Sequence, residues 1–347
     1  MKRILICGNF GTGGPTSSGQ VIKVKMVSEQ IINHFGSEAC EQFNTFKRLS
    51  SLLTIYLWML PTMFRYRHAV IFPAQRGVIL LIPAFYLARL IYGVKVHYVV
   101  IGGWLPNYTK RLGVVKYMLK KYDGIYVETN TMRVSLSEQG LHNVLLMPNF
   151  KSLDLINEED IKKQTEAPFR ICTFSRVMRQ KGIEMIINAV IDINRGEGET
   201  VYELDVYGKV EHGEEEWFER LINVFPSYCQ YKGIVPPNQS TKVIKEYFML
   251  VFPTLFFTEG IPGTILDAYA SGVPVLSSKW ESFADIITEG VTGYGYEFGN
   301  YQQLKAFLLD LSKNPSKVDE LRLNCLKEAQ KYTPEVVMKT LVDKLQQ

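Results

Sequence analysis

The sequence has few of the residues that build metal or redox centres. Its five cysteines are scattered and include no Cys-x-x-Cys pair, its five histidines are isolated, and no Asp-x-Asp dyad occurs. Zinc and divalent-cation sites need such clusters. We therefore expect no metal and no cofactor. The cysteines are expected to be structural thiols in a reducing compartment, because Cys7 and Cys172 fall in apolar strand-like segments.

Long hydrophobic runs are also missing. The stretches Leu49–Phe64 and Gly77–Ala88 are uncharged, but each contains a proline and each is shorter than the roughly 20 residues that span a bilayer. The apolar run of the N-terminal segment is too brief for a signal peptide. We expect a cytoplasmic protein in which these stretches either are buried elements or touch an anionic membrane peripherally. The cations that flank them are Lys47, Arg48, Arg65, Arg67, Arg76 and Arg89.

Charge is divided unevenly along the chain. Residues 1–156 carry 18 Lys or Arg and 7 Asp or Glu, whereas residues 157–347 carry 21 and 28. A basic half suits an anionic surface or substrate. No nucleic-acid-binding motif accompanies the basic residues, so nucleic acid is not an expected partner.

Strand-like and helix-like segments alternate from end to end, which predicts parallel α/β sheets. The length predicts two domains, and the polar segment 157–168 is the expected linker between domains at 1–156 and 169–332. The first helix is expected at about 20–35, and residues 333–347 form a last helical stretch. The predicted strands are 3–7, 69–72, 95–100, 124–127 and 143–147, then 169–174, 202–207, 230–232, 251–252 and 273–276.

An acid pair is the most informative feature. Glu259 and Asp267 are separated by seven residues, with a turn rich in Gly and Pro after the first acid and a predicted helix around the second. Backbone N–H groups at a helix N-terminus receive phosphate, and carboxylates accept hydrogen bonds from hydroxyls. A nucleotide sugar needs both kinds of group.

A second candidate phosphate site is the loop of small residues at 11–20, between the first strand and the first helix. Neither common nucleotide fingerprint fits it, because Thr16 stands where a G-x-G-x-x-G motif needs its last glycine and no P-loop ending follows. Two pairs of small residues are candidate contacts, Ser18 with Gly19 and Gly13 with Gly14, and both remain open; the family resemblance given below favours Gly19.

The acid pair resembles the Glu-x7-Glu signature of retaining GT-B glycosyltransferases of family four, with Asp267 in place of the second Glu. The segment Thr173–Ile183 resembles that family's strand–Gly-Arg-Leu-x-x-x-Lys-Gly–helix segment, with Ser175 in the usual glycine position. The resemblance covers most of the chain. It implies two Rossmann-like, doubly wound parallel-sheet domains that face a central cleft, and a C-terminal helix at 333–347 that crosses back to the first domain.

The resemblance also implies roles. Glu259 would accept hydrogen bonds from the donor sugar, Asp267 from the ribose, and Arg176 and Lys181 would stabilise the departing diphosphate. The strand end at Gly233 matches the place where the family holds the base. A histidine that many relatives carry is replaced here by Ile101 or Gly102. The residues expected to line the sugar and phosphates are Gly260, Ile261, Pro262, Gly263, Thr264 and Ile265.

The function implied is a metal-independent, retaining hexosyltransferase. It would move a sugar from a nucleoside diphosphate donor to a glycan or lipid-diphosphate-linked acceptor in bacterial surface polysaccharide synthesis. UDP is preferred over GDP as the expected nucleotide of the donor. Two alternatives remain open. One is a nucleotide-sugar 2-epimerase on the same fold, and the other is a catalytically silent scaffold that partners another glycosyltransferase.

Overall fold

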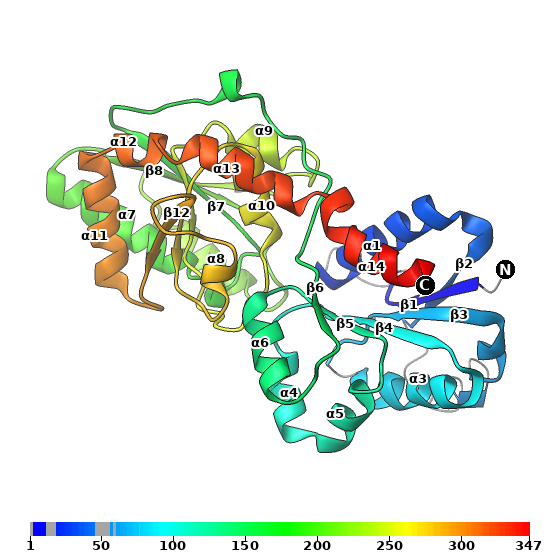
Figure 1. The fold of residues 1–347 in the computed structure, drawn as a ribbon. Helices are drawn as coiled ribbons and strands as arrows, with labels where there is room; N and C mark the ends of the chain where they lie inside the picture. Colours follow the sequence, from blue (N-terminus) through cyan, green and yellow to red (C-terminus); the bar gives the residue numbers. More distant parts are fainter. Residues whose placement is uncertain (1–2, 12–18, 46–55, 58–59, 76) are drawn as a thin grey trace. The chain divides into compact units, whose positions relative to one another are not determined.

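A computed structural model describes residues 3–11, 19–45, 56–57, 60–75 and 77–347. The chain forms two compact units, shown in Figure 1. Unit 1 comprises Met1–Asn149 with Pro334–Gln347, and unit 2 comprises Phe150–Thr333. The polar segment 157–168 lies within unit 2. Among the described residues, no helix combines the length and the apolar character needed to cross a membrane.

Unit 1 is built on a six-stranded sheet in the order β2-β1-β3-β4-β5-β6, and every neighbouring pair is parallel. Parallel strands are buried on both faces, which explains the continuous apolar runs in the sequence. The strands are β1 (Arg3–Gly8), β2 (Cys40–Asn44), β3 (Tyr66–Ile71), β4 (Lys95–Val99), β5 (Gly124–Val127) and β6 (Val144–Leu146).

Helices cover both faces of this sheet. Helix α1 packs beside α14, which comes from the far end of the sequence, on one face, and α3 and α5 lie on the other (Figure 1). Gln346 donates a hydrogen bond to the His34 ring, 2.9 Å between nitrogens, which ties the end of α14 to α1. The helices are α1 (Gly19–Phe35), α3 (Val78–Tyr92), α4 (Leu105–Arg111), α5 (Gly113–Leu119), α6 (Asn130–Glu138) and α14 (Pro334–Gln346), with the short 3-10 helices η1 (Ser37–Ala39) and η3 (Leu60–Arg65).

Unit 2 repeats this architecture with a parallel sheet in the order β12-β11-β10-β7-β8-β9. Its two faces carry separate apolar clusters, one built with α7, α8 and α11 and the other with α9, α10 and α13. The strands are β7 (Phe169–Phe174), β8 (Tyr202–Tyr207), β9 (Cys229–Gly233), β10 (Met249–Phe252), β11 (Val275–Ser278) and β12 (Gly293–Tyr296). The helices are α7 (Ile183–Glu197), α8 (Glu215–Ile222), α9 (Ser240–Ile244), α10 (Gly263–Ala270), α11 (Tyr301–Lys313), α12 (Ser316–Asp319) and α13 (Arg322–Ala329), with the 3-10 helices η4 (Glu158–Asp160), η5 (Arg179–Lys181), η6 (Phe283–Asp285) and η7 (Gln330–Tyr332).

The predicted fold class, two doubly wound Rossmann-like sheets, is confirmed. All ten predicted strands are present; three have the predicted bounds, and the ends of the others shift by at most three residues. Two strands were missed, β2 and β12, and both lie at a sheet edge. The sequence of β2, Cys-Glu-Gln-Phe-Asn, is polar, and that of β12, Gly-Tyr-Gly-Tyr, is rich in glycine. Such short edge strands lack the apolar run that marks a central strand.

A tight turn at Gly182 fixes the segment that follows β7. Gly182 lies between η5 and α7 and caps both helices. Its φ of 67° is in the left-handed region, which residues with a side chain rarely adopt. A Cβ atom there would lie 1.9 Å from the carbonyl oxygen of Pro253, at the end of β10. The absence of a side chain therefore lets two adjacent strand ends approach each other.

We predict that Gly182→Ala lowers the free energy of unfolding by about 3 kcal/mol, because the backbone must shift as well as adopt a strained φ. The matched control is Gly196→Ala in α7, where an added Cβ meets nothing within 4 Å. That control should gain about 0.5 kcal/mol, since Ala is the better helix former. Urea unfolding of the three proteins tests both values. Equal midpoints for Gly182→Ala and the parent would contradict the account of this turn.

Candidate functional site

The candidate site lies in unit 2, where parallel strands end. Strands β10, β7, β8 and β9 are neighbours in that order, so the segments after their carboxyl ends meet along one edge of the sheet. Ligands of open α/β sheets bind at this edge. The predicted residues Arg176, Lys181, Gly233 and Glu259 all follow these strand ends or terminate them.

Lys181 and Glu259 form the centre of the site. The Lys181 Nζ lies 2.5 Å from Glu259 Oε2, and their side chains are only 10% and 17% exposed. Thr254 Oγ1 donates to the same carboxylate oxygen at 3.3 Å, and the Lys181 ammonium lies 5.4 Å from the centroid of the Phe252 ring. Within the described residues, Glu259 Oε1 has no hydrogen-bond partner. The pair is therefore held in place with one acceptor oxygen available to a ligand.

The loop after Glu259 leads into helix α10. Pro262 precedes the helix and cannot cap it through a side-chain hydrogen bond, so the first turn keeps backbone donors for an acceptor from outside. In the described structure the buried Thr264 hydroxyl has no hydrogen-bond partner. A buried hydroxyl without a partner is costly, and an acceptor in a bound ligand would satisfy it.

Asp267, in the second turn of α10, is paired with a lysine that the sequence analysis missed. Lys151 Nζ lies 2.6 Å from each carboxylate oxygen of Asp267. The Asp267 side chain is 8% exposed and that of Lys151 is 21% exposed. Burial raises the pKa of the Asp267 carboxyl, and the Lys151 charge opposes this effect. A hydroxyl that approached Asp267 would meet a carboxylate already bound to an ammonium group.

The two predicted cations have different surroundings. Arg176 is paired with Glu211, 2.8 Å between Nη1 and Oε2, and its side chain is 58% exposed. Lys181, by contrast, is nearly buried against Glu259. Gly233 ends β9 with φ of 73°, and its carbonyl accepts a hydrogen bond from Gly208 N at 2.8 Å. The structure thus brings Lys181 and Glu259 together and leaves Arg176 on a more open loop.

In unit 1, Gly19 is the exposed first residue of α1, and Gly13, Gly14 and Ser18 lie outside the described residues. The backbone at Gly102 follows β4 with φ of 79°. His97 lies inside β4, where its ring contacts the His68 ring at 3.0 Å and the Tyr126 hydroxyl at 3.1 Å. Burial lowers the pKa of His97 to about 3, so this histidine is a neutral core residue.

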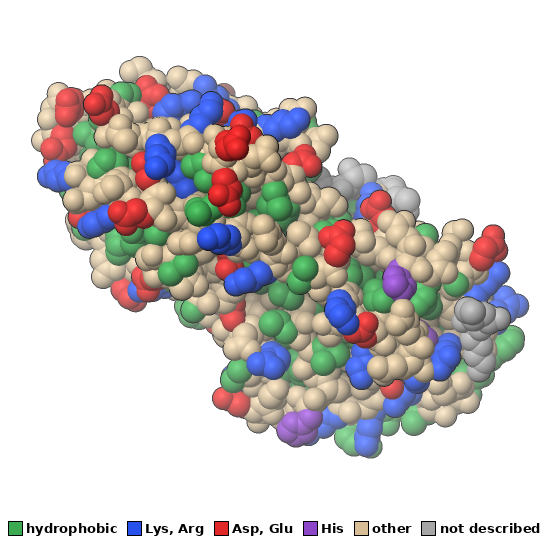
Figure 2. All heavy atoms as spheres, turned by 45° about the horizontal axis from the view of Figure 1, so that its top comes forward, with side chains coloured by type: hydrophobic (Ala, Val, Ile, Leu, Met, Phe, Trp, Pro, Cys, Tyr) green, Lys and Arg blue, Asp and Glu red, His purple; other side chains and the backbone are tan. Residues whose placement is uncertain are grey.

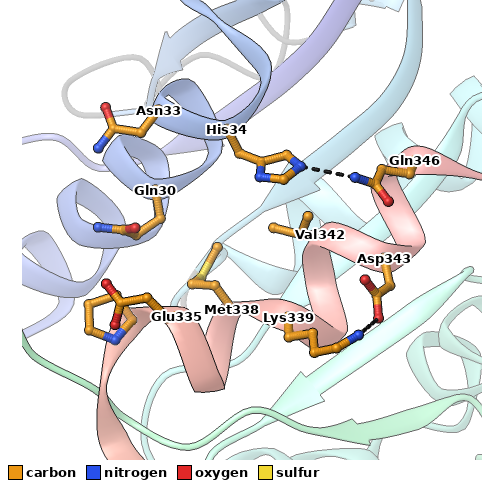
Figure 3. Close-up of a pocket in the computed structure, with 10 residues that line it drawn as sticks. Gln30, Asn33, His34, Glu335, Met338, Lys339, Val342, Asp343 and Gln346 are labelled. Carbon is orange, nitrogen blue, oxygen red and sulfur yellow. Dashed lines mark hydrogen bonds and ion pairs between the residues drawn. The ribbon is translucent and has the colours of Figure 1, made fainter.

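Figure 3 shows an open pocket of about 440 Å³ between α1 and α14 of unit 1. Its lining combines apolar surface with polar side chains, two of which, Lys339 and Asp343, form an ion pair with each other at 2.6 Å. None of the predicted site residues lines it. The full lining is Gln30, Asn33, His34, Pro334, Glu335, Met338, Lys339, Val342, Asp343 and Gln346.

Part of unit 2 matches a known protein family. Residues 168–314 match the family model of group 1 glycosyl transferases. The matched region contains Arg176, Lys181, Glu259 and Asp267. The chain is 27% identical over 163 residues to the amylovoran biosynthesis glycosyltransferase AmsK of Erwinia amylovora. That alignment covers 44% of this chain and 38% of AmsK, so the chain spans well under two thirds of that relative.

Solved structures show the same fold. Anabaena HepE, in complex with UDP, matches with a TM-score of 0.77 at 15% identity over 99% of both chains. The lipopolysaccharide outer core galactosyltransferase WaaB, in its apo form, matches with a TM-score of 0.73 at 15% identity, again over 99% of both chains. At 15% identity these likenesses show the fold alone, and the paired parallel sheets of this chain are of the GT-B fold class.

The Lys151–Asp267 pair gives a pH-dependent prediction. Lys151→Met keeps the aliphatic stem over Gly263 but leaves a buried carboxylate without its cation, so we expect a loss of about 3 kcal/mol in unfolding free energy at pH 8. The loss should shrink toward pH 5. The pKa of Asp267 in the folded variant is raised above that in the unfolded chain, so the native state takes up a proton first and gains stability as pH falls.

The matched control is Lys162→Met. Lys162 forms an ion pair with Glu246, and its side chain is 53% exposed. Loss of such a pair should cost under about 1 kcal/mol. Chemical denaturation at both pH values provides the comparison. A deficit for Lys151→Met that is small, or that grows at low pH, would refute the pairing.

Proposed function

We propose that this chain is a retaining, metal-independent glycosyltransferase of the Glu-x7-Glu type, with Asp267 as the second acid. Its donor is a nucleoside diphosphate sugar, for which we favour UDP over GDP as the nucleotide. Its acceptor is a glycan or a lipid-diphosphate-linked saccharide. The observation that carries the proposal is the buried Lys181–Glu259 pair at the carboxyl edge of the second sheet. The match of residues 168–314 to group 1 glycosyl transferases supports it.

Donor binding follows from the groups at this edge. The first-turn amides of α10 and the unsatisfied Thr264 hydroxyl suit the diphosphate, since a helix N-terminus favours anions. Glu259 Oε1 accepts from a sugar hydroxyl while Oε2 remains bound to Lys181. The backbone at Gly233 holds the base, and the remaining donor contacts are those of the loop from Gly260 to Ile265. The ribose binds beside the Lys151–Asp267 pair, where an ammonium and a carboxylate offer both a donor and an acceptor.

Transfer proceeds by cleavage of the bond between the anomeric carbon and the diphosphate oxygen. Negative charge then develops on the leaving diphosphate, and the Lys181 ammonium stabilises it from a fixed position. Arg176 reaches the same anion after it leaves Glu211, because its side chain is exposed. The acceptor hydroxyl oxygen forms the new bond to the anomeric carbon on the face that the diphosphate leaves, and the leaving diphosphate takes the hydroxyl proton, so the configuration is retained. The chain's contribution is positioning and electrostatic stabilisation.

The biological setting is bacterial surface polysaccharide synthesis, at the cytoplasmic face of the membrane. The similarity to AmsK, an amylovoran biosynthesis glycosyltransferase, and to WaaB, a lipopolysaccharide outer core galactosyltransferase, supports this setting. The complex of HepE with UDP supports a uridine donor.

Glu259→Gln and Lys181→Gln should each lower kcat at least 100-fold, because each removes a charge that acts on the reacting sugar or diphosphate. Each also leaves the partner's charge without a counterion at a largely buried site, so the thermal unfolding midpoint should fall, and kcat is measured at a temperature at which both variants are folded. Matched controls come from the neighbouring ion pair of Arg179, in the same 3-10 helix as Lys181, with Glu214, which precedes α8; their side chains are 54% and 18% exposed. Arg179→Gln and Glu214→Gln should retain kcat within about twofold.

The assay uses a panel of UDP- and GDP-sugars with a membrane extract as acceptor source, in EDTA, and assigns product anomers by NMR. Inversion, or turnover only with added divalent cation, would refute the mechanism. Release of an epimerised sugar nucleotide would indicate the epimerase instead. Donor binding without turnover, and wild-type glycan output from the Glu259→Gln strain, would indicate a silent scaffold.

A further inference from the structure

Helix α3 has an unusual surface. A helix at the surface of a soluble protein normally presents polar side chains to solvent. In α3, however, the solvent-facing positions Ile79, Leu90 and Ile91 are 58%, 62% and 60% exposed, and Leu87 between them is 37% exposed. Arg89 is the helix's one charged residue, and it is used in an ion pair with Asp123 at 2.8 Å. The outer side of α3 is therefore apolar along its length.

The neighbouring elements extend this surface. Helix α5 packs against α3 and adds Val114 and Tyr117, which are 70% and 57% exposed. The Tyr117 ring contacts Tyr86 of α3 edge to face at 6.4 Å between centroids, which joins the two helices at their outer side. We call this surface the α3–α5 face, made of Ile79, Tyr86, Leu87, Leu90, Ile91, Val114 and Tyr117.

Cations border the α3–α5 face. Lys110 and Arg111 end α4, which packs against α5, and Lys116 lies within α5. Lys121 follows α5, with its ammonium 5.9 Å from the Tyr117 ring centroid. From residue 42 to residue 122 the sequence has 12 Lys or Arg and no Asp or Glu. Figure 2, in which the top of Figure 1 comes forward, shows Lys and Arg among hydrophobic side chains at lower right, in unit 1; α3 and α5 lie at the bottom in Figure 1, so their outer side does not face the viewer.

We propose that the α3–α5 face binds an anionic lipid bilayer in the plane of its interface. Apolar side chains enter the boundary between head groups and acyl chains while the bordering cations contact anionic head groups. Helix α3 has 15 residues and contains Pro83, so it lies on the bilayer and does not cross it. Lysine is depleted at protein–protein interfaces, so this composition favours a lipid surface over a protein partner. The proposal rests on unit 1 alone and does not depend on the donor site.

The test is flotation of the purified protein with vesicles of phosphatidylcholine, with and without phosphatidylglycerol. We expect tight binding to the anionic vesicles and weak binding to the neutral ones. The triple variant Ile79→Gln/Leu90→Gln/Ile91→Gln changes only side chains that are more than half exposed, and it should lose at least 100-fold in binding. Each cation near an anionic surface contributes about fivefold, so Lys110→Gln/Lys116→Gln/Lys121→Gln should lose on the order of 100-fold.

Matched controls lie in unit 2. Lys313→Gln/Lys327→Gln/Lys331→Gln removes three exposed cations, and Val224→Gln removes an apolar side chain that is 70% exposed. Both should bind vesicles as the parent does, and all variants should keep the parent's thermal midpoint and donor hydrolysis. Equal binding of the parent to both vesicle types, or unchanged binding of either α3–α5 variant, would overturn the proposal. So would dimerisation in sedimentation velocity that the apolar variant abolishes, since it would assign the face to a second copy of the chain.

Discussion

The candidate site depends on the ion pair between Lys181 and Glu259. These residues are 78 positions apart, yet their side chains meet because β7 and β10 are adjacent and the turns after both strands lie together. Gly182 makes the approach possible, since any side chain there would collide with the Pro253 carbonyl. Burial of these two charges loses hydration free energy, so the ion pair contributes little to stability. Its position at the edge of the sheet where ligands bind therefore favours a functional role.

A second ion pair lies further along α10. Lys151 and Asp267 resemble Lys181 and Glu259 in that each joins a loop lysine to an acid of the segment 259–267. The pairs differ in their acceptor capacity. Glu259 has an oxygen without a partner in the described structure, whereas both oxygens of Asp267 contact Lys151. The second acid of the pair, Asp267, is thus bound by Lys151, a lysine that the sequence spacing does not reveal.

The two units share a fold, but their surfaces differ. Unit 2 carries its charged side chains largely as ion pairs, among them Arg176–Glu211, Arg179–Glu214 and Lys317–Asp310. Unit 1 has a long segment without acids, so none of the cations there has a carboxylate within the same segment to pair with. This asymmetry agrees with our proposals of a site for a small anionic donor in unit 2 and a surface for an extended anionic partner in unit 1.

The sequence alone determined the fold class and the segments that carry the site, because buried parallel strands leave apolar runs and the turns between them keep Gly, Pro and charged residues at fixed spacing. Edge strands β2 and β12 were not predicted because β2 is polar and largely unburied, and the four residues of β12 alternate glycine with tyrosine and give no apolar run. Only the tertiary structure decided which charges meet. Lys151 reaches Asp267 across 116 positions, and Arg176 pairs with Glu211, because strand order and loop packing fix these distances and no local pattern encodes them.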